Sequence, residues 1–596
     1  MMRSRCAGLL PALLGLLAVG AARAETTTGG VTWLDSLSYT KPAFYPITVP
    51  TEASVSNKYY VDFTSGSGTT CSSGSPCGSL SSVAGKAGMS GGPAYVYVRG
   101  NQSPMQLTSG NFFGSAGNEI VIKPWPGDST PTVWTAASGC TTSNANGFAA
   151  STVHHVIVDG GPDGLITFKG SGCTTDQNGY TALIISNDIT LYRVRIDANG
   201  SSGPALGWAT GEGTTTNNTR IINTEIYGAT LYYGIYVGGG ANCASGNSAM
   251  NNAELRNSII RDVDGRGIQV ETRTPGASAG LIIDGNAFHN VGKGGGSACS
   301  YGISQGVQLA NACRGAVVTG TKVTNNLFFD MGGGMVQAFP VDDTTQLIAN
   351  NTEYDYAKSA CTASAQSHGM NASGSNAGIY NNIILAPAQG GLDSIYDRAN
   401  LVSGNNLCQS GSTTCGASSL TSTAASVFQS TSTGSANFLK PAAGGPAENA
   451  GTNKYASGVV TDYLGAARPS SGSVEIGAME IGSGTGLNGS AALTEAADTV
   501  AATTTTVNDG PFAATEAADT LAGVGGTGAC AGTYRVVTPP TGAETALHRV
   551  AGAWVPCTAA SPTLLCDKSL GTIWTICNGG DCRQQQRRNK AWVSCP

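Results

Sequence analysis

The 596-residue sequence predicts an all-β solenoid, a single-stranded parallel β-helix, with a small disulfide-rich appendage at its C-terminal end. Three observations lead to this fold class: two short apolar strands around a polar corner recur along the chain, the corners align on one column, and glycine is abundant while only 11% of residues are charged. Repeats of roughly 20 to 50 residues built from short strands bury a core only by stacking on their neighbours.

The repeat is clearest in the stretch Ala253 to Glu271, with the sequence AELRNSIIRDVDGRGIQVE. We expect its large apolar side chains to be buried as part of the stacked scaffold, namely Leu255, Ile259, Ile260, Ile268 and Val270. Strand alternation then turns Gln269, Glu271 and Arg273 outward.

The polar corners of successive repeats form a column with steps of 25 to 40 residues. Its members are Arg193, Asn223, Asn257, Asn286, Asn326, Asn351 and Asn382. Asparagine tolerates left-handed backbone at a corner, and amides stacked on successive rungs can bond each other. We therefore expect this column to be structural.

The first 24 residues have the pattern of a secretory signal peptide. Arg3 and Arg5 precede a short apolar run, and Ala22-Arg23-Ala24 is a small-x-small cleavage site. A membrane anchor is the alternative, but the run is short for a bilayer. We expect a protein without an integral membrane segment after cleavage, secreted to the medium or cell surface, with the periplasm also open.

Composition shifts divide the rest of the chain into four parts. We expect an extended N-terminal arm over 25–57, the β-helix over 58–482, a linker or short β appendage with two TEAADT repeats over 483–526, and a cysteine-rich module over 527–596. The net charge of -6 argues against a nucleic-acid partner. We expect a monomer.

Sixteen cysteines remain after Cys6 leaves with the signal peptide, an even number that favours disulfides in an exported protein. The predicted pairs are two local clips, Cys71 with Cys77 and Cys408 with Cys415, and a pair between two identical SGCTT segments, Cys140 with Cys173. Metal binding by these cysteines is a weak alternative because no paired CxxC motifs occur.

Several segments resemble secreted bacterial right-handed parallel β-helix proteins of the pectate-lyase-like superfamily. They are YYVDFTSGSG from Tyr59, AYVYVRG from Ala94, IVIKPWPGD from Ile120 and the repeats themselves. The segment Thr461 to Gly482 resembles the sequence that often closes such helices, with an acid at Glu475 and a Gly-Ala-x-Glu ending at Glu480. The resemblance covers about 58–482 and implies a right-handed helix that acts on acidic or neutral polysaccharides.

Two reactions are common in enzymes of that superfamily. A lyase needs a base beside a uronate carboxylate and a cation, often Ca²⁺ held by carboxylates, to neutralise it. A hydrolase needs two carboxyl groups. The rung after Asn257 carries a surplus of charge, so we select the following residues from it and the rungs beyond. The catalytic candidates are Arg266, Glu271, Lys293 and His368; the substrate-binding candidates are Gln269, Arg273 and Asn371; the calcium-ligand candidates are Asp262, Asp264, Asp342 and Asp343.

Other interpretations stay open. The same charges can be a solvated face with salt bridges. The protein can be a glycoside hydrolase, or a non-catalytic adhesin or glycan-binding β-helix, an interpretation that the modular C-terminal region favours. A similarity of Asp342-Asp343 and His368-Gly369 to polygalacturonases fails in most of its parts. For the lyase, the hydrolase and the glycan-binding protein alike, the expected partner is a polysaccharide or a cell-surface glycan.

Overall fold

The computed structural model describes residues 24–27, 30–102, 104–107, 112–136, 146–174, 179–208, 215–238, 249–271, 278–294, 305–310, 318–338, 345–358, 368–371, 377–388, 394–396, 402–412 and 414–481, and the strands within 534–594. Contacts within the chain define two compact units, Met1–Ala491 and Ala492–Pro596. The predicted signal peptide, apart from its last residue, and the predicted linker lie outside the described residues.

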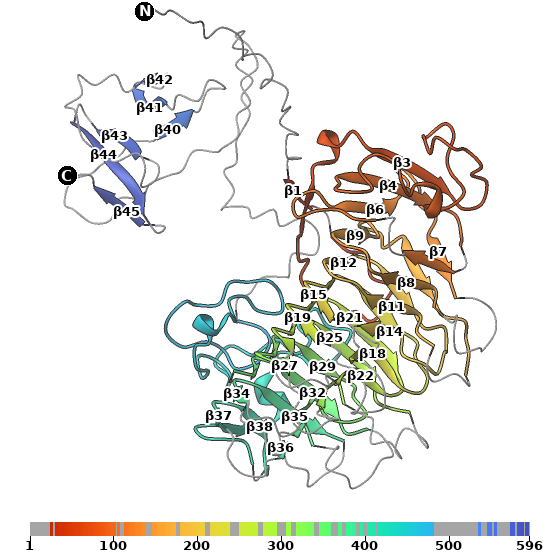
Figure 1. Cartoon of the computed structure of the whole chain (residues 1–596). Coiled ribbons are helices and arrows are strands. Elements are labelled where there is room, and N and C mark those ends of the chain that lie inside the picture. Colours follow the sequence, from red (N-terminus) through yellow and green to blue (C-terminus); the bar gives the residue numbers. More distant parts are fainter. Residues whose placement is uncertain are drawn as a thin grey trace, which may run out of the picture. The chain divides into compact units, whose positions relative to one another are not determined.

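The first unit is a parallel β-helix in which each turn of the chain adds one strand to each of three long sheets (Figure 1). Sheet 1 contains β5 (Met105–Leu107), β8 (Phe148–Ser151), β11 (Ala182–Ile185), β14 (Leu206–Trp208), β18 (Tyr233–Gly238), β22 (Arg266–Glu271), β26 (Val307–Ala310), β30 (Val336–Ala338), β33 (Met370–Asn371) and β36 (Ile395–Tyr396). Sheet 2 contains β3 (Lys58–Asp62), β4 (Ala94–Arg99), β6 (Ile120–Pro124), β9 (Val156–Asp159), β12 (Ile189–Tyr192), β16 (Arg220–Ile222), β20 (Glu254–Arg256), β24 (Ile282–Asp284), β28 (Lys322–Thr324), β31 (Leu347–Ala349), β34 (Gly378–Tyr380) and β37 (Val402–Gly404). Sheet 3 contains β7 (Thr132–Thr135), β10 (Ile166–Lys169), β13 (Arg195–Asp197), β17 (Glu225–Tyr227), β21 (Ile259–Val263), β25 (Ala287–Val291), β29 (Leu327–Phe329), β32 (Thr352–Tyr356), β35 (Ile383–Pro387), β38 (Leu407–Gln409) and β39 (Leu420–Ser422).

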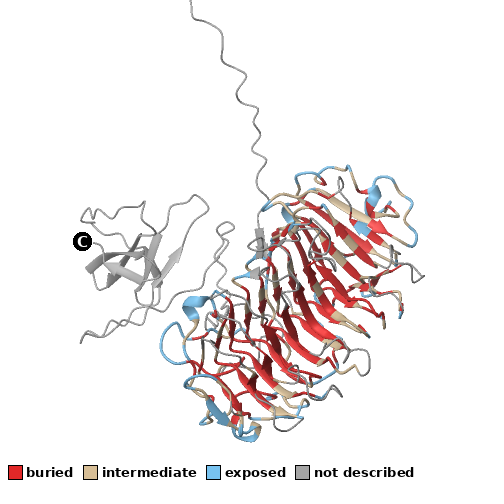
Figure 2. Cartoon of the chain, turned by 60° about the horizontal axis from the view of Figure 1, so that its bottom comes forward, coloured by how far each residue is buried: buried red, intermediate tan, exposed pale blue. Residues whose placement is uncertain are grey.

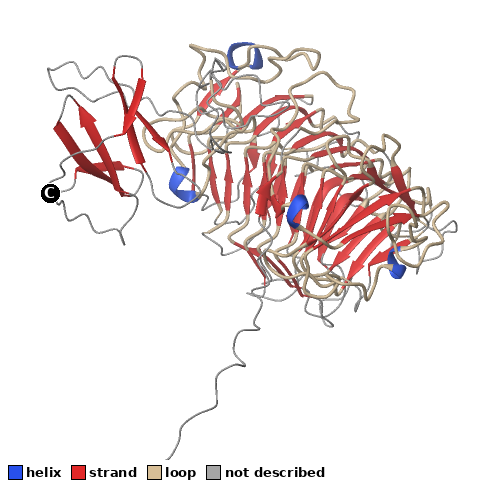
Figure 3. Ribbon diagram, turned by 90° about the horizontal axis from the view of Figure 1, so that it is seen from above, coloured by secondary structure: helices blue, strands red, loops and turns tan. Residues whose placement is uncertain are grey.

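A fourth, short sheet contains β15 (Thr215–Asn217), β19 (Ala249–Asn251), β23 (Ser278–Ala279) and β27 (Val318–Thr319), and β1 (Ala24–Thr26) pairs with β2 (Thr48–Pro50). The described helices are single turns, α2 (Ala424–Val427), η1 (Glu52–Ser54), η2 (Leu80–Ser82) and η3 (Tyr455–Ser457), so strands and loops dominate the unit (Figure 3). This is the right-handed parallel β-helix that the sequence and its resemblance predict, which is confirmed.

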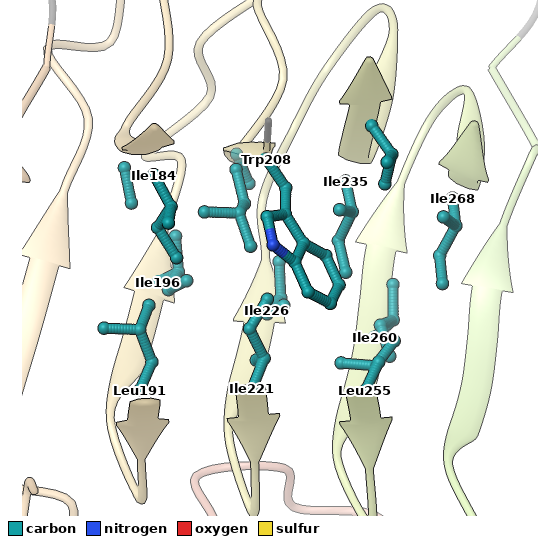
Figure 4. Packing of buried hydrophobic residues seen from close by; sticks show 14 of the residues in the cluster. Ile184, Leu191, Ile196, Trp208, Ile221, Ile226, Ile235, Leu255, Ile260 and Ile268 are labelled. Atoms are coloured by element: carbon teal, nitrogen blue, oxygen red, sulfur yellow. The ribbon is translucent and has the colours of Figure 1, made fainter. Parts of the chain in front are cut away.

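The core is the interior of the coil. Alternate residues of all three sheets point inward, and the strands are buried along the whole stack (Figure 2; Figure 4). In sheet 3 the inward position is occupied on successive rungs by Ile260, Phe288 and Phe328. The facing residues of sheet 1 are glycines because a Cβ on Gly306 would lie 2.5 Å from the Phe328 ring. This close approach explains the glycine that recurs in the second strand of each repeat.

The polar residues at the corners have a structural role, as expected. However, the seven residues aligned in the sequence belong to two neighbouring columns, one residue apart along the chain. Arg193, Asn223 and Asn257 lie at the corner itself, with φ between 48° and 53°. In the later turns that corner is occupied by Gly285 and Asn325. The second column, one residue further on, is a buried amide ladder formed by Asn286, Asn326, Asn351, Asn382 and Asn406.

Removal of one amide from this ladder is expected to destabilise the fold. Asn326 Nδ2 donates to Ile283 O (2.9 Å) and Asn351 Oδ1 (3.0 Å), while its Oδ1 accepts from Asn286. We expect Asn326→Ala to lower the free energy of unfolding by on the order of 3 kcal/mol, since buried partners lose their bonds. Urea unfolding measures this. The control is Asn217→Ala in the partly exposed ladder with Asn187 and Asn251, where we expect under about 1 kcal/mol. Equal losses at the two sites would contradict the role of burial.

The N-terminal arm is extended, and it packs along the β-helix. Tyr39 lies against Phe329 on the outer face of sheet 3, with 4.9 Å between the rings. Ala43 N donates to Tyr463 O (3.2 Å), and the Tyr463 hydroxyl donates to Thr40 O (3.2 Å). The arm therefore meets the segment that closes the helix at its other end.

The Ser/Thr-rich segment Ser410 to Asn437 packs against the β-helix in its described residues. β39 continues sheet 3, and Phe428 and Phe438 then pack on that sheet's outer face. The closing sequence holds the buried Arg468, which donates to Asn325 Oδ1 (2.9 Å) and pairs with Glu480. Burial, followed by a hydrogen bond to Glu475, raises the pKa of Glu480 to about 8. Glu475 and Glu480, which carry the resemblance in the closing segment, therefore lie in a buried charged cluster with Arg468 and have a structural role.

Two predicted disulfides are confirmed. Cys71 is bonded to Cys77 and Cys408 to Cys415, with Cα–Cα distances of 4.6 Å and 6.1 Å. Cys173 is in a disulfide, and its predicted partner Cys140 lies outside the described residues.

The second unit contains two three-stranded antiparallel sheets. One is formed by β40 (Tyr534–Val537), β41 (Thr545–Val550) and β42 (Ala553–Pro556), and the other by β43 (Ile573–Asn578), β44 (Asp581–Arg588) and β45 (Ala591–Ser594). The two AWV segments of the sequence are the third strand of each sheet, so this unit repeats one hairpin-like motif. Within the described part of the chain, no helix has the length and apolar character to span a bilayer.

Candidate functional site

The outer face of sheet 1 carries a row of amide side chains. On four consecutive strands the same outward position is Gln269, Gln308, Gln337 and Asn371, as the strand register shows. Gln308 Nε2 donates to Gln337 Oε1 (2.7 Å). These side chains are only 3–7% exposed, which fixes the directions of their amide groups. Such a row offers donors and acceptors at each rung.

Tyrosines extend the row at both ends. Tyr236 precedes Gln269 in the register, and Tyr396 follows Asn371; both are partly exposed. We call the six residues from Tyr236 to Tyr396 in this register the outer tract. Its five steps span about 24 Å at ~4.8 Å per strand. Tyr236 stacks on Tyr233 with 5.5 Å between the rings, which makes a wider aromatic surface at this end.

Arg266 lies beside the tract on the rung of Gln269. Its side chain is 7% exposed, bonds to Gln269 Oε1, and donates to Gln305 Oε1 (3.3 Å). The guanidinium also lies 5.8 Å from the centre of the Tyr233 ring. A permanent positive charge is therefore held in a defined direction among neutral polar groups.

His368 lies at the other end of the tract. Its ring stacks on Tyr396, with 4.5 Å between the centroids. The register puts His368 three rungs beyond Arg266, so about 14 Å separates their backbones. The two side chains therefore face different parts of any bound chain.

Four predicted site residues are thus brought to one face: Arg266, Gln269, His368 and Asn371. The backbone of Glu271 pairs with Gly238 and Ala310 at the end of the same strand, and nothing is described of its side chain. The remaining predicted residues of this group, Arg273, Asp342 and Asp343, lie outside the described residues.

The charged rung is split between two faces, which corrects the single site expected there. Asp262 lies in β21 of sheet 3, where it binds Arg261 and accepts from Asn290 Nδ2 (2.6 Å). Lys293 follows β25 in the same sheet and binds Asp330. Neither belongs to the tract, because the chain turns a corner between β21 and β22.

Asp264 lies in that corner, two residues before Arg266. Within the described residues its carboxyl group has no hydrogen-bond partner, and burial raises the pKa of Asp264 above its usual range. Two residues of extended chain span at most about 7 Å, so Asp264 is close to Arg266 along the backbone. A half-buried carboxyl with a raised pKa, two residues from an arginine along the chain, is a candidate for proton transfer.

The described carboxylates do not fit a calcium site. Asp262 lies on sheet 3, and Asp264 lies in the corner between β21 and β22. Among the residues that the structure describes, no group of three or more His, Cys, Asp or Glu side chains is placed to hold a metal ion. The predicted ligands Asp342 and Asp343 lie outside that part of the chain.

The early histidine pair has packing roles. His154 stacks on Phe113 (5.6 Å), and both His154 and His155 lie 3.8 Å from Asp188.

Sequence reasoning missed four residues of the tract, namely Tyr236, Gln308, Gln337 and Tyr396, and also the neighbouring Tyr233 and Gln305. The signal was present in the second strands, which read YGIYV, RGIQV, QGVQL, GMVQA and HGMNA. Alignment of their glycines and apolar residues puts Tyr, Gln, Gln, Gln and Asn in one outward column.

No family model and no curated protein matches this sequence. Among solved structures, the chain is similar to pectate lyase Pel9A, with 16% identity, coverage of 72% of this chain and 97% of that one, and a TM-score of 0.47. It is also similar to a rhamnogalacturonan lyase (14% identity, 65% and 96% coverage, TM-score 0.41) and to an alginate lyase from Paenibacillus sp. str. FPU-7 (14%, 55% and 97%, 0.36). At these sequence identities and TM-scores the similarity extends to the fold and not to the function.

Proposed function

We propose that this protein cleaves an acidic polysaccharide bound along the outer tract, by β-elimination next to a uronate carboxylate. The observation that carries the proposal is the position of Arg266, a fixed cation beside a row of amides that ends in tyrosines. Tyrosine rings supply flat apolar surfaces with a polar tip, and amides bond hydroxyl groups. The row is long enough for several sugar units.

In the proposed reaction Arg266 binds the uronate carboxylate through its planar fork and withdraws charge from it. That makes the neighbouring C–H proton easier to remove. Asp264, the carboxylate closest along the chain, takes this proton, and its raised pKa makes it a stronger base than an ordinary aspartate. The electron pair of the broken C–H bond forms the double bond of the product, the bond from carbon to the glycosidic oxygen breaks, and this oxygen leaves as a hydroxyl group after taking a proton from water.

His368 does not share a catalytic centre with Arg266 in this proposal, because three rungs separate them. We assign it, with Asn371 and Tyr396, to binding of a sugar unit further along the chain. Glu271 stays a candidate for acid–base work at the end of β22.

The test is an activity screen of the full-length protein. The substrates are polygalacturonate, alginate and rhamnogalacturonan, with neutral xylan for comparison, and the assays measure absorbance of unsaturated uronate and release of reducing ends. We expect unsaturated product from an acidic substrate and a rate that rises with pH as Asp264 loses its proton. Asp264→Asn should nearly abolish it. Reducing ends without unsaturated product would identify a hydrolase instead, and binding without cleavage would identify a glycan-binding protein.

A further inference from the structure

A polar pocket lies away from the outer tract, where the N-terminal arm crosses sheet 3 near the carboxyl ends of β21, β25 and β29. Its volume is about 330 Å³, within the range of roughly 300–1,000 Å³ that small ligands use. One wall is the arm segment Leu34 to Leu37, and the other is formed by three successive rungs of sheet 3. The lining residues from those rungs are Arg261, Asp262, His289, Asn290 and Asp330.

Each carboxylate of this pocket already has a positively charged partner. Asp35 binds Lys41 (2.7 Å) and lies 2.9 Å from His289. Burial acts to raise the pKa of Asp35, but His289 and Lys41 outweigh it and hold that pKa well below its usual range. Asp35 is therefore ionised, and its charge is matched.

The other two carboxylates are matched in the same way. Asp262 shares Arg261 with the buried Glu225, and Asp330 binds both Lys293 and Lys358. Burial opposes ionisation of Asp330, but the two lysines lower its pKa overall. A charged ligand would therefore bring an unmatched charge into a partly buried, balanced site, which is unfavourable.

Hydrogen-bonding capacity remains after these pairs are formed. An ionised carboxylate has about four acceptor positions. Asp262 Oδ1 accepts from Asn290 and Oδ2 from Arg261, so positions remain on each oxygen. The Asp262 and Asp330 side chains are 41% and 33% exposed, so the hydroxyl groups of a ligand can reach them from solvent. The arm adds an apolar rim, because Leu34 is 50% and Leu37 38% exposed.

We propose that this pocket binds a neutral polyhydroxyl ligand the size of one sugar ring. Its hydroxyl groups donate to Asp262 and Asp330, and its C–H face lies on Leu34 and Leu37. The site is independent of the lyase proposal, since it uses none of the residues assigned to that reaction. A ligand held between the arm and sheet 3 also opposes detachment of the arm.

Calorimetric titration of the full chain with D-galactose, D-xylose, L-rhamnose and the charged sugar D-galacturonate tests the proposal. We expect saturable binding of at least one neutral sugar and weaker binding of galacturonate. Asp262→Asn should weaken the neutral sugar at least tenfold and leave polysaccharide cleavage unchanged. The matched control is Asp355→Asn, because Asp355 also binds Lys358 but does not line the pocket.

Three results would overturn the proposal: no saturable heat with any neutral sugar, tighter binding of galacturonate, or equal weakening by Asp355→Asn. If Asp262→Asn does not fold, as measured by its thermal unfolding, Leu34→Ala at the exposed rim replaces it and should also weaken binding. If the native protein binds a neutral sugar in this pocket but cleaves no polysaccharide, this inference stands and the lyase proposal fails.

Discussion

Replacement of Glu353 with leucine is expected to stabilise the protein at neutral and alkaline pH. Glu353 points into the coil between Phe328 and Ile384 and is completely buried. Among the described residues neither of its carboxyl oxygens has a hydrogen-bond partner, and the nearby Met335 N donates to Gly369 O (2.8 Å). Leucine fits the apolar stack that Glu353 interrupts and leaves no buried polar group unpaired.

The effect has a defined pH dependence. Burial raises the pKa of Glu353 well above its usual range, so the folded protein keeps a proton that the unfolded chain releases above about pH 4.3. Stability therefore falls as the pH rises from the unfolded pKa towards the folded one, by about 1.4 kcal/mol per pH unit from this group. Urea unfolding of Glu353→Leu should lack this slope.

Glu353→Gln separates charge from polarity. It should remove the same slope but remain less stable than Glu353→Leu by about 1–3 kcal/mol, because its amide is buried without partners. Glu119→Gln, at a partly exposed carboxylate, should leave both the slope and the stability almost unchanged. An unchanged pH slope in Glu353→Leu would show that the buried carboxyl is not the group that titrates.

Replacement of Arg266 with alanine is expected to lower the rate of polysaccharide cleavage on the order of 10²-fold or more. The side chain supplies the charge proposed to stabilise the enolate-like intermediate, and loss of one such oriented donor commonly costs this much. Lysine restores the charge without the planar fork, so Arg266→Lys should recover only part of the rate. Initial rates over a range of substrate concentrations, by absorbance of the unsaturated product, measure both.

Arg220→Ala is the matched control, because Arg220 lies on sheet 2 and is paired with Glu254 (3.1 Å). It should keep nearly the full rate. Thermal unfolding of the three variants separates loss of the site from loss of the fold. Equal rates for Arg266→Ala and the native protein would remove Arg266 from the reaction.

The fold could be predicted because its rules are local. Short strands, glycine corners and stacked asparagines recur at every turn, and each turn contacts chiefly its neighbours. The alignment error between Asn257 and Asn286 has a physical origin: the ladder position is occupied by Ser258 on the earlier rung, and Ser258 continues the ladder by accepting through its hydroxyl from Thr224 N. Because this ladder position is a serine on the earlier rung, the asparagines alone do not show where the ladder begins.

The site was predictable only in part. Arg266, Gln269, His368 and Asn371 were selected as candidates, and the register brings them to one face. Asp262 and Lys293 were joined to them because they are near in sequence, but the corner before β22 turns them onto sheet 3. The cover that the arm gives to sheet 3 depends on contacts such as that between Tyr39 and Phe329, which join distant parts of the chain and have no local pattern.

The inward orientation of Glu353 could not be predicted from the sequence pattern. The strand TEYDY looks like a surface strand, and only the register with Phe328 reveals that Glu353 points into the core. The Glu353 carboxyl group packs against Gly369, where a Cβ would lie 2.8 Å from Glu353 Oε2.

The most direct test of the outer tract is the affinity for an acidic oligosaccharide of a double variant, Gln308→Ala with Gln337→Ala. These two amides are adjacent rungs of the tract, and neither is assigned to the chemical step. Lys169→Ala, at a partly exposed position on sheet 3, is the control. We predict that calorimetry will show affinity at least tenfold weaker in the double variant and unchanged in the control. Unchanged affinity in a folded double variant would contradict the tract as the polysaccharide site.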